Sequence, residues 1–328
     1  MAKSQASMLK SIRTVAVLGL GTMGHGIAQT FAAAGYQVRC FDEQKAARDS
    51  LRDRIAANLA EFARAGLVRK ASIRPILARI TTCASEADAV RDARFVTEAV
   101  REDLSTKREL FARIEGLVAD DAILASNSST YPISESASEM KRPERAIITH
   151  WFNPPHIVPA VEVVPGKRTS EATTRTAMAL MTHIGKVAIR IDKELPGFLV
   201  NRIQVAVMRE VWDLWSRGVA SPEAIDAAVR ASMGFRLAAV GPLEVHDFGG
   251  LDIQARVFNN LVHDIRSDTE LPAKIRDLVA ASHFGAKTGK GIYKYTARTI
   301  AAKQSRRDRA FLALLKMFYP QGGKANKQ

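Results

Sequence analysis

Cysteine is scarce in this sequence, which holds only Cys40 and Cys83 among its 328 residues. Neither belongs to a CxxC pair or to a cluster of cysteines and histidines, so the sequence suggests neither a disulfide scaffold nor a zinc site. Free cysteines are typical of a reducing compartment, and we therefore expect a cytoplasmic protein.

Long apolar runs are also missing. Even the stretch 198–207 is interrupted by Asn201, Arg202 and Gln204, and no run approaches the ~20 residues of a membrane span. We therefore expect no transmembrane helix. The start of the chain carries basic side chains without the apolar core of a secretory signal, so residues 1–12 are interpreted as a short flexible lead-in.

Acidic side chains are outnumbered, with 34 Asp and Glu against 48 Lys and Arg, which gives a net charge of +14. Such a charge attracts polyanions. The basic residues are scattered, however, and aromatics make up only 6% of the chain, without a zinc finger or an aromatic-rich RNA-binding strand. We therefore expect no specific nucleic-acid binding; a dinucleotide cofactor and an anionic substrate such as a CoA ester suit the charge better.

What the sequence does contain is an alternation of strand and helix patterns. The strand-like segment Val15–Leu18 leads into a glycine-rich turn, a helical pattern over Met23–Ala34 and a second strand over Tyr36–Phe41. This βαβ order predicts a parallel sheet covered by helices. We expect an α/β, Rossmann-type, doubly wound domain over residues 13–195, with a helix over 44–65 and further strands over 93–96, 122–125, 146–149, 161–164 and 187–191.

Beyond the Pro196-Gly197 break the strand signals vanish, and the apolar positions follow helical spacing. This predicts an all-α domain over residues 196–300, with helices over 198–218, 222–231, 251–265 and 272–281.

The apolar side of the first of these helices includes Val207, Val211 and Leu214, which indicates a bundle core or a dimer interface. We favour a homodimer. Residues 301–328 are predicted to form a basic amphipathic helix and tail, which docks on the protein's own surface or on a partner subunit.

The run VAVLGLGTMGHG places Gly19, Gly21 and Gly24 in GxGxxG spacing directly after a strand, where a helix begins. Gly19 allows the tight turn, Gly21 lets backbone approach a pyrophosphate, and Gly24 allows close packing of the helix. The helix N-terminus offers unpaired N–H groups to phosphate. The turn, with Thr22 and Met23, is therefore predicted to bind a dinucleotide.

Asp42 follows the second strand about twenty residues beyond the glycines, where a carboxylate accepts hydrogen bonds from the ribose of NAD. Asp42 and Glu43 would repel the 2′-phosphate of NADP, which favours NAD, although Arg39 and Lys45 lie nearby. The alternative role for Asp42 is to cap the helix predicted after it.

Polar clusters follow predicted strands at residues 126–129 and 150–155, and Glu162 lies within or at the end of an apolar strand. The carboxyl ends of parallel strands line the ligand crevice, so we expect these clusters beside the cofactor. A buried carboxylate needs a partner. We predict that His150 takes the hydroxyl proton of a substrate while Glu162 orients the imidazole and stabilises its charged form.

These motifs occur in a fixed order: GLGTMGHGIA, SNSS, HWFNPP, VEVV, LPGFLVNR, GP at 241–242, GLD at 250–252 and FGAKTGKGIYKY. Over about residues 13–295 the chain resembles the 3-hydroxyacyl-CoA dehydrogenase family. The resemblance implies NAD-dependent oxidation of L-3-hydroxyacyl-CoA to 3-oxoacyl-CoA, in fatty acid metabolism.

Roles carried over from the resemblance make His150 the general acid/base and Glu162 its carboxylate partner. Ser129 and Asn201 match residues that hold the substrate's oxygen. From residue chemistry alone, Ser129 could equally be part of a turn, and Asn201 could cap or cross-link helices. The positions that match cofactor contacts are Glu102, Lys107, Asn153 and Lys287.

Two other functions remain open. Dehydrogenases of the hydroxyisobutyrate and phosphogluconate type share the GLGxMG turn and an all-α second domain but use a lysine as proton carrier, whereas HWFNPP with VEVV favours histidine. A non-catalytic NAD-binding protein could keep the same fold. The presence of Ser129, His150, Glu162 and Asn201 together favours an active enzyme.

One segment departs from the fatty-acyl members of the family: Arg236 stands in Gly-Phe-Arg-Leu before the GP motif. Such segments, and the NPPHIVP turn, resemble relatives that oxidise small free hydroxy acids, including gulonate, carnitine and pyridoxine-catabolite dehydrogenases. An arginine binds a carboxylate through two hydrogen bonds. Arg236 is thus a candidate substrate residue, and the alternative is a surface arginine paired within the helical domain.

Overall fold

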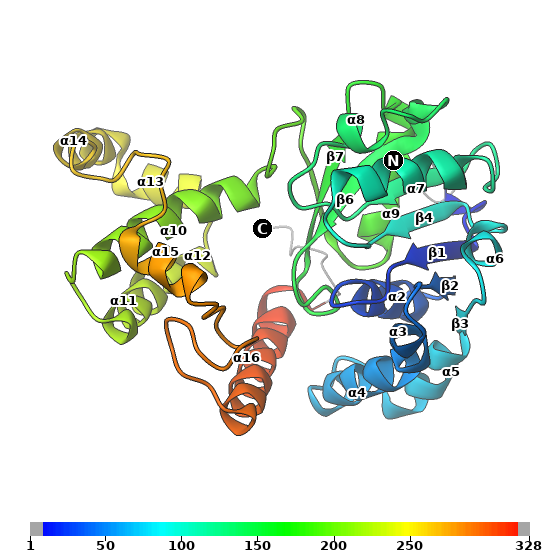
Figure 1. Ribbon diagram of the computed structural model, residues 1–328, viewed down its shortest axis with the longest axis horizontal. Helices are drawn as coiled ribbons and strands as arrows, with labels where there is room; N and C mark the ends of the chain where they lie inside the picture. Colours follow the sequence, from blue (N-terminus) through cyan, green and yellow to red (C-terminus); the bar gives the residue numbers. More distant parts are fainter. Residues whose placement is uncertain (1–8, 321–328) are drawn as a thin grey trace. The chain divides into compact units, whose positions relative to one another are not determined.

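The computed structural model describes residues 9–320, which divide into two compact units. The first contains the described residues up to Leu199 together with those from Arg307 onward, and the second contains Val200–Arg306. Figure 1 labels most helices and strands of both units. Residues 1–8 of the predicted lead-in and 321–328 of the predicted tail lie outside the described part of the chain.

The first unit is built on one eight-stranded sheet of order β3-β2-β1-β4-β5-β6-β7-β8. All neighbouring strands run parallel except β6 and β7, which are antiparallel. The strands are β1 (Thr14–Leu18), β2 (Gln37–Phe41), β3 (Ile80–Thr82), β4 (Phe95–Glu98), β5 (Ile123–Ser126), β6 (Ala146–Trp151), β7 (Ala160–Pro165) and β8 (Val187–Arg190).

Helices cover both faces of this sheet, as expected for a doubly wound fold. Alternate strand residues point to opposite faces, and two separate apolar clusters result. One joins Val15 and Val17 to α2 (Gly24–Ala33), α4 (Leu51–Arg64) and α9 (Glu171–His183). The other joins Ala16 and Leu18 to α6 (Glu86–Val90), α7 (Leu104–Glu115) and α8 (Ile133–Ser136). The remaining helices of this unit are α3 (Lys45–Asp49), α5 (Ile73–Ala78) and the 3₁₀ turns Lys70–Ser72 and Pro143–Arg145.

The predicted Rossmann-type sheet is confirmed, with most strand bounds shifted by one or two residues. The single helix predicted over 44–65 is wrong in one respect, because it is divided at Ser50 into α3 and α4. The short strand β3 was not predicted, since only Ile80 of its three residues is buried and the apolar signal is weak.

The second unit is all-α, as predicted. Its helices are α10 (Val200–Ser216), α11 (Pro222–Val229), a π-helical turn (Arg230–Gly234), α12 (Phe235–Leu237), α13 (Pro242–Gly249), α14 (Leu251–Leu261) and α15 (Ala273–Ala280). Only Pro272 and Ile275 are buried among residues 200–306. The apolar faces of these helices are therefore largely uncovered within the chain.

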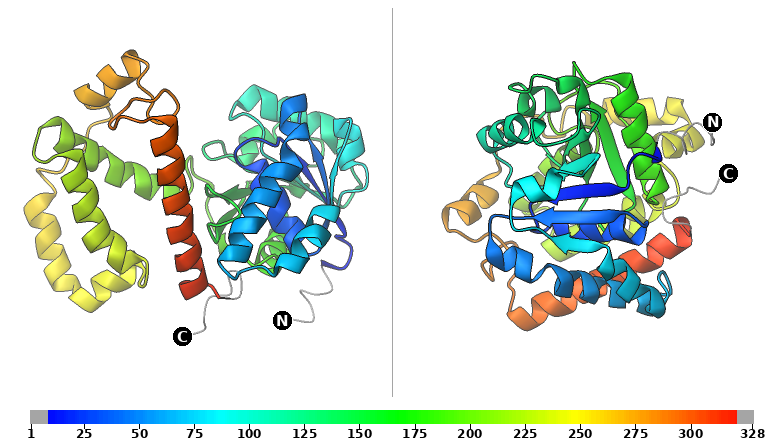
Figure 2. Two further views of the ribbon diagram at one scale, coloured as in Figure 1. Left: turned by 90° about the horizontal axis from the view of Figure 1, so that it is seen from below. Right: turned by 90° about the vertical axis from the view of Figure 1, so that its right-hand side faces the viewer.

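The last helix, α16 (Ala297–Phe318), is continuous in both views of Figure 2. It begins four residues before the predicted start at 301. Its residues from Arg307 onward belong to the first unit, where Leu312 is buried. Across residues 9–320, no helix combines the length and the apolar character needed to cross a membrane.

Candidate active site

The glycine turn between β1 and α2 has the geometry that close backbone approach requires. Gly19 has φ +88°, and a Cβ there would lie 2.5 Å from the carbonyl oxygen of Ala99. A Cβ on Gly24 would lie 1.8 Å from the carbonyl oxygen of Gly19, whereas one on Gly21 would meet nothing within 4 Å. Glycine is thus demanded at 19 and 24 by the fold, and position 21 leaves room for a pyrophosphate beside the start of α2.

Asp42, at the end of β2, is bonded to this turn. Its Oδ2 accepts a hydrogen bond from the backbone N–H of Leu20 at 2.6 Å, and its Oδ1 accepts one from Gln44 N–H at 2.8 Å. Gln44 is the N-cap of α3, so the carboxylate orders both the turn and the helix start. Each carboxylate oxygen has a second lone pair, which keeps ribose contact feasible.

Arg54, from α4, holds the same turn by its carbonyl groups. Its guanidinium donates to Leu20 O at 2.8 Å, to Gly21 O at 3.3 Å and to Ala47 O at 3.0 Å. Burial lowers the pKa of Arg54, and the charge of Asp42 opposes that shift. Leu20 therefore has its N–H fixed by one side chain and its carbonyl fixed by another.

A buried ionic network lies at the carboxyl ends of β4 and β5. Lys107 Nζ is 2.8 and 3.0 Å from the two carboxylate oxygens of Glu98, and both side chains are almost completely buried. Ser126 donates to Glu98 at 2.6 Å, and the backbone N–H of Val100 donates to it at 2.8 Å. These bonds compensate the cost of burying both charges.

Glu102 extends this network to the SNSS cluster. It lies 3.1 Å from Lys107 Nζ and accepts hydrogen bonds from Ser128 Oγ at 2.7 Å and from Ser129 N–H at 2.8 Å. Partial burial acts to raise the pKa of Glu102, but the charge of Lys107 and the hydrogen bonds from the serines outweigh it, so the pKa is lowered. An ionised Glu102 thus shapes the loop that carries Ser129.

The antiparallel pairing of β6 and β7 sets His150 directly opposite Glu162. His150 Nδ1 lies 2.7 Å from Glu162 Oε2, and the side chains are 3% and 0% exposed. With Nδ1–H donating to the carboxylate, Nε2 is the ring nitrogen left to exchange a proton with a substrate.

Phe198 and Leu199 of the LPGFLVNR motif contact this pair. Phe198 adopts φ +51°, an uncommon conformation for an aromatic residue, and its ring centroid lies 5.5 Å from that of His150. The next residue, Leu199, donates its backbone N–H to Glu162 Oε1 at 3.2 Å. The ring of Phe152 lies 4.6 Å from His150 on the β6 side. The imidazole therefore has two aromatic rings as neighbours.

The loop after β6 is fixed from behind by residues that the sequence analysis did not single out. Lys186 donates to Pro155 O at 2.6 Å and to Val158 O at 2.8 Å. A Cβ on Gly26 of α2 would lie only 2.7 Å from His156 Nδ1, so glycine permits close contact with this loop. Asn153, the predicted cofactor contact, is exposed at its start.

The first unit thus brings together the glycine turn, Asp42, Glu102, Lys107, Ser129, His150, Asn153 and Glu162 at one edge of the sheet. Asn201 in α10, Arg236 in α12 and Lys287 after α15 belong to the second unit. Their roles at the site stay predictions.

Several functional residues were missed because single-residue chemistry does not identify them. Arg54 and Lys186 act through backbone carbonyls far away in sequence. Glu98 was hidden in an apolar strand pattern, although the argument applied to Glu162, that a buried carboxylate needs a partner, would have found it.

Comparison with known proteins agrees with this geometry. Residues 14–195 match the model of the 3-hydroxyacyl-CoA dehydrogenase NAD-binding domain, and residues 197–295 match that of the C-terminal domain. The chain belongs to the 3-hydroxyacyl-CoA dehydrogenase family. It is an NAD-dependent dehydrogenase that acts on a CH–OH group, as its relatives are.

The chain is similar to dehydrogenases of two kinds, one that acts on a pyridine carboxylate and one that acts on a CoA ester. A 5-formyl-3-hydroxy-2-methylpyridine 4-carboxylate 5-dehydrogenase of Mesorhizobium japonicum is 35% identical over 92% of this chain and 97% of its own. A 3-hydroxybutyryl-CoA dehydrogenase of Clostridioides difficile is 35% identical over 86% of this chain and 99% of its own. The crystal structure of a dehydrogenase with the first of these activities matches with a TM-score of 0.87 and 34% identity, over 93% of this chain and 98% of that one.

Proposed function

We propose that the chain oxidises a 3-hydroxyacyl substrate, most simply L-3-hydroxyacyl-CoA to 3-oxoacyl-CoA, with His150 and Glu162 as the acid-base pair. The observation that carries this proposal is the buried 2.7 Å contact between His150 Nδ1 and Glu162 Oε2. It lies at the same edge of the sheet as the glycine turn, where parallel-sheet enzymes bind their ligands.

In this reaction His150 Nε2 takes the proton of the substrate hydroxyl as the carbonyl forms. The glycine turn and Asp42 would hold NAD, which would supply the hydride acceptor for the same carbon. Glu162 fixes the orientation of the ring and stabilises the imidazolium that results, and Leu199 N–H holds the other carboxylate oxygen in place. In the reverse direction the same ring returns the proton.

The other predicted residues divide between substrate and cofactor. Ser129 and Asn201 would hold the reacting oxygen, and Arg236 would contact the far part of the substrate. The cofactor contacts would come from Gly19, Gly21, Thr22, Met23, Gly24, Asp42, Glu102, Asn153 and Lys287, and Lys107 would act on the cofactor indirectly. Lys107 is bonded to two glutamates in the structure, so its contribution is to position Glu102 and the loop after β4.

A small free hydroxy acid is the second candidate substrate. The relative that acts on a pyridine carboxylate matches 92% of this chain, whereas the CoA-dependent relative matches 86% and is itself matched almost completely. The C-terminal family model ends at residue 295, before α16 begins. An arginine binds a carboxylate through two hydrogen bonds, so Arg236 favours a free acid over a fatty-acyl thioester.

One assay separates these candidates. The purified chain is supplied with NADH and either acetoacetyl-CoA or free 3-oxo acids, and with NAD and the matching 3-hydroxy compounds, while absorbance at the NADH band is followed. Turnover of the thioester alone supports the first candidate, and turnover of free acids alone supports the second. No turnover with any of them contradicts both.

We also propose a homodimer formed through the second unit. Within residues 200–306 only two residues are buried, and Phe235, Leu243 and Phe248 are more than three-quarters exposed. An apolar surface of this kind marks a protein contact. Sedimentation of the whole chain is expected to give a dimer, and Leu243→Glu with Phe248→Glu is expected to weaken it; a monomeric wild type at micromolar concentration contradicts the proposal.

A cytoplasmic location is proposed as well. Cys40 and Cys83 are both buried and free, as is typical of a reducing compartment. Fractionation of cells that make the protein tests this directly, and enrichment in an oxidising compartment contradicts it.

A further inference from the structure

A cavity of about 360 Å³ lies in the first unit, apart from the active site. It is bounded by the carboxyl half of α2, by α4, by the loop after β6, by the turn between α9 and β8, and by the end of α16. None of the glycine turn, Asp42, His150 or Glu162 lines it. Its volume falls in the range of small-molecule sites.

The walls of this cavity are mostly apolar. Leu59 and Phe62 come from α4, Ile157 from the loop after β6, and Leu315 from α16. No aspartate or glutamate is present among the residues that line it, whereas Lys186 is; burial lowers the pKa of His156 to about 3, so that imidazole carries no charge. The lining therefore suits an apolar molecule that carries a negative charge.

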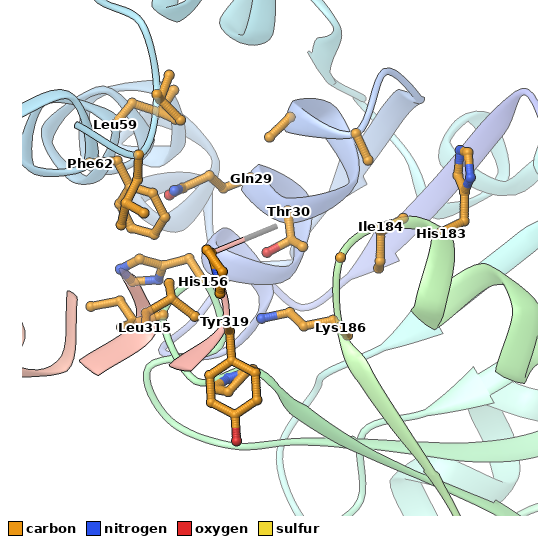
Figure 3. A pocket seen from close by; sticks show the side chains of 18 residues that line it. Gln29, Thr30, Leu59, Phe62, His156, His183, Ile184, Lys186, Leu315 and Tyr319 are labelled. Atoms are coloured by element: carbon orange, nitrogen blue, oxygen red, sulfur yellow. The ribbon is translucent and has the colours of Figure 1, made fainter. Parts of the chain in front are cut away.

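Lys186 supplies a buried cation whose identified partners are all neutral. Its ammonium donates to two carbonyl oxygens and lies 5.1 Å from the centre of the Trp151 ring. The residue is only 5% exposed, and burial lowers the pKa of Lys186 to about 7. A charge without a carboxylate partner is costly in such surroundings, and an anion beside it would reduce that cost. In Figure 3 the side chain extends toward His156 and Tyr319.

Gln29 contributes a buried side-chain oxygen that lacks a hydrogen-bond partner in the described part of the chain. Its side chain is 2% exposed and lines the cavity, and the oxygen is Oε1. Buried amide oxygens are nearly always satisfied in native proteins. A ligand with a hydrogen-bond donor, or a water that accompanies it, would complete this group.

We propose that this cavity is a second small-molecule site, which binds a carboxylic acid with a compact aliphatic or aromatic body. The carboxylate pairs with Lys186, and the body packs against Phe62, Ile157 and Leu315. A bound acid would rest on the loop that begins at Asn153, and this contact gives the site a route to influence cofactor binding.

The test is binding of hexanoate to the whole chain, measured by calorimetry in the presence of saturating NADH, with hexanamide as the uncharged analogue. Saturable binding of hexanoate, at least about tenfold tighter than hexanamide, is expected. Ala33→Phe places a bulky side chain at the cavity wall and leaves the bonds of Lys186 in place, and Lys186→Met removes the charge. Each variant is expected to weaken hexanoate binding by about tenfold or more.

His150→Asn serves as the control for binding in the active site. Hexanoate affinity unchanged by this variant but lost in Ala33→Phe supports the proposal, even if Lys186→Met fails to fold. Affinity lost in His150→Asn and kept in Ala33→Phe places hexanoate in the active site and overturns the proposal. Equal binding of hexanamide, or no saturable binding, overturns it too.

Discussion

His150 and Glu162 occupy directly opposed positions on two antiparallel strands, with Nδ1 and Oε2 2.7 Å apart and both side chains buried. The carboxylate is buried, so its hydrogen bonds come from within the protein, from the ring of His150 and from the backbone N–H of Leu199. In the proposed mechanism His150 exchanges the proton and Glu162 orients its ring, so we expect substitutions of the two residues to lower kcat by different factors.

Replacing His150 with Asn is expected to lower kcat by a factor of about 10²–10⁴, because the group that takes the hydroxyl proton is removed. NAD affinity is expected to stay within about twofold, since the glycine turn and Asp42 are untouched. Glu162→Gln should lower kcat less, as it keeps a hydrogen bond to the ring but not the charge. Steady-state kinetics with NADH titration by fluorescence measures both effects, and near-normal kcat in His150→Asn contradicts the mechanism.

Arg54 is expected to control the affinity for the cofactor without taking part in the reaction. Arg54→Met removes the hydrogen bonds to the Leu20 and Gly21 carbonyls and should raise KM for NAD about tenfold, with kcat nearly unchanged. Arg64→Met, on the same helix and exposed, makes the same charge change away from the turn. An equal effect of the two variants would show that only net charge matters.

A substitution at Gly26 tests how closely α2 packs against the loop after His150. Gly26→Ala would bring a Cβ to 2.7 Å from His156 Nδ1 and 2.8 Å from Pro155 Cγ. Such overpacking is expected to lower the free energy of unfolding by about 1–3 kcal/mol, despite the better helix propensity of alanine. Gly116→Ala is the matched control, since φ there is −80° and nothing lies within 4 Å. Urea denaturation measures the free energy of unfolding of both variants, and only Gly26→Ala is expected to lower it.

Lys186 makes stability depend on pH in a definite direction. Burial lowers its pKa in the folded chain to about 7, whereas an unfolded lysine keeps a pKa of about 10.4. Between these values the unfolded chain holds a proton that the folded chain has lost, so this group raises stability as pH rises, by up to about 1.4 kcal/mol per unit. Below pH 7 both states are protonated and the contribution is constant.

Denaturation of wild type and Lys186→Met at pH 7 and pH 9 measures this dependence. The free energy of unfolding of the wild type, relative to the variant, is expected to increase from pH 7 to pH 9. The exposed Lys316→Met variant should show no comparable change. If the difference in the free energy of unfolding between wild type and Lys186→Met is the same at pH 7 and pH 9, this lysine keeps its proton in the folded chain over that range.

The sequence predicted most strands of the first unit and the contact between His150 and Glu162, because both depend on local patterns. Strand alternation and the glycine spacing predicted the sheet, and a carboxylate in an apolar strand called for a partner. The sequence could not show that β7 runs antiparallel to β6, because strand direction depends on how the connection folds back. It also could not reveal Arg54 or Lys186, whose partners are backbone carbonyls that leave no trace in residue identity.

The antiparallel pairing of β6 and β7 also links catalysis to the fidelity of folding. Side chains alternate between the faces of a strand, so a shift of one residue between these strands would turn Glu162 away from His150 and bring Val163 opposite it. A misregistered chain could keep its glycine turn and still bind NAD, yet it would have no acid-base pair. The turnover rate divided by the amount of bound cofactor is therefore expected to be proportional to the fraction of molecules with the native register between β6 and β7.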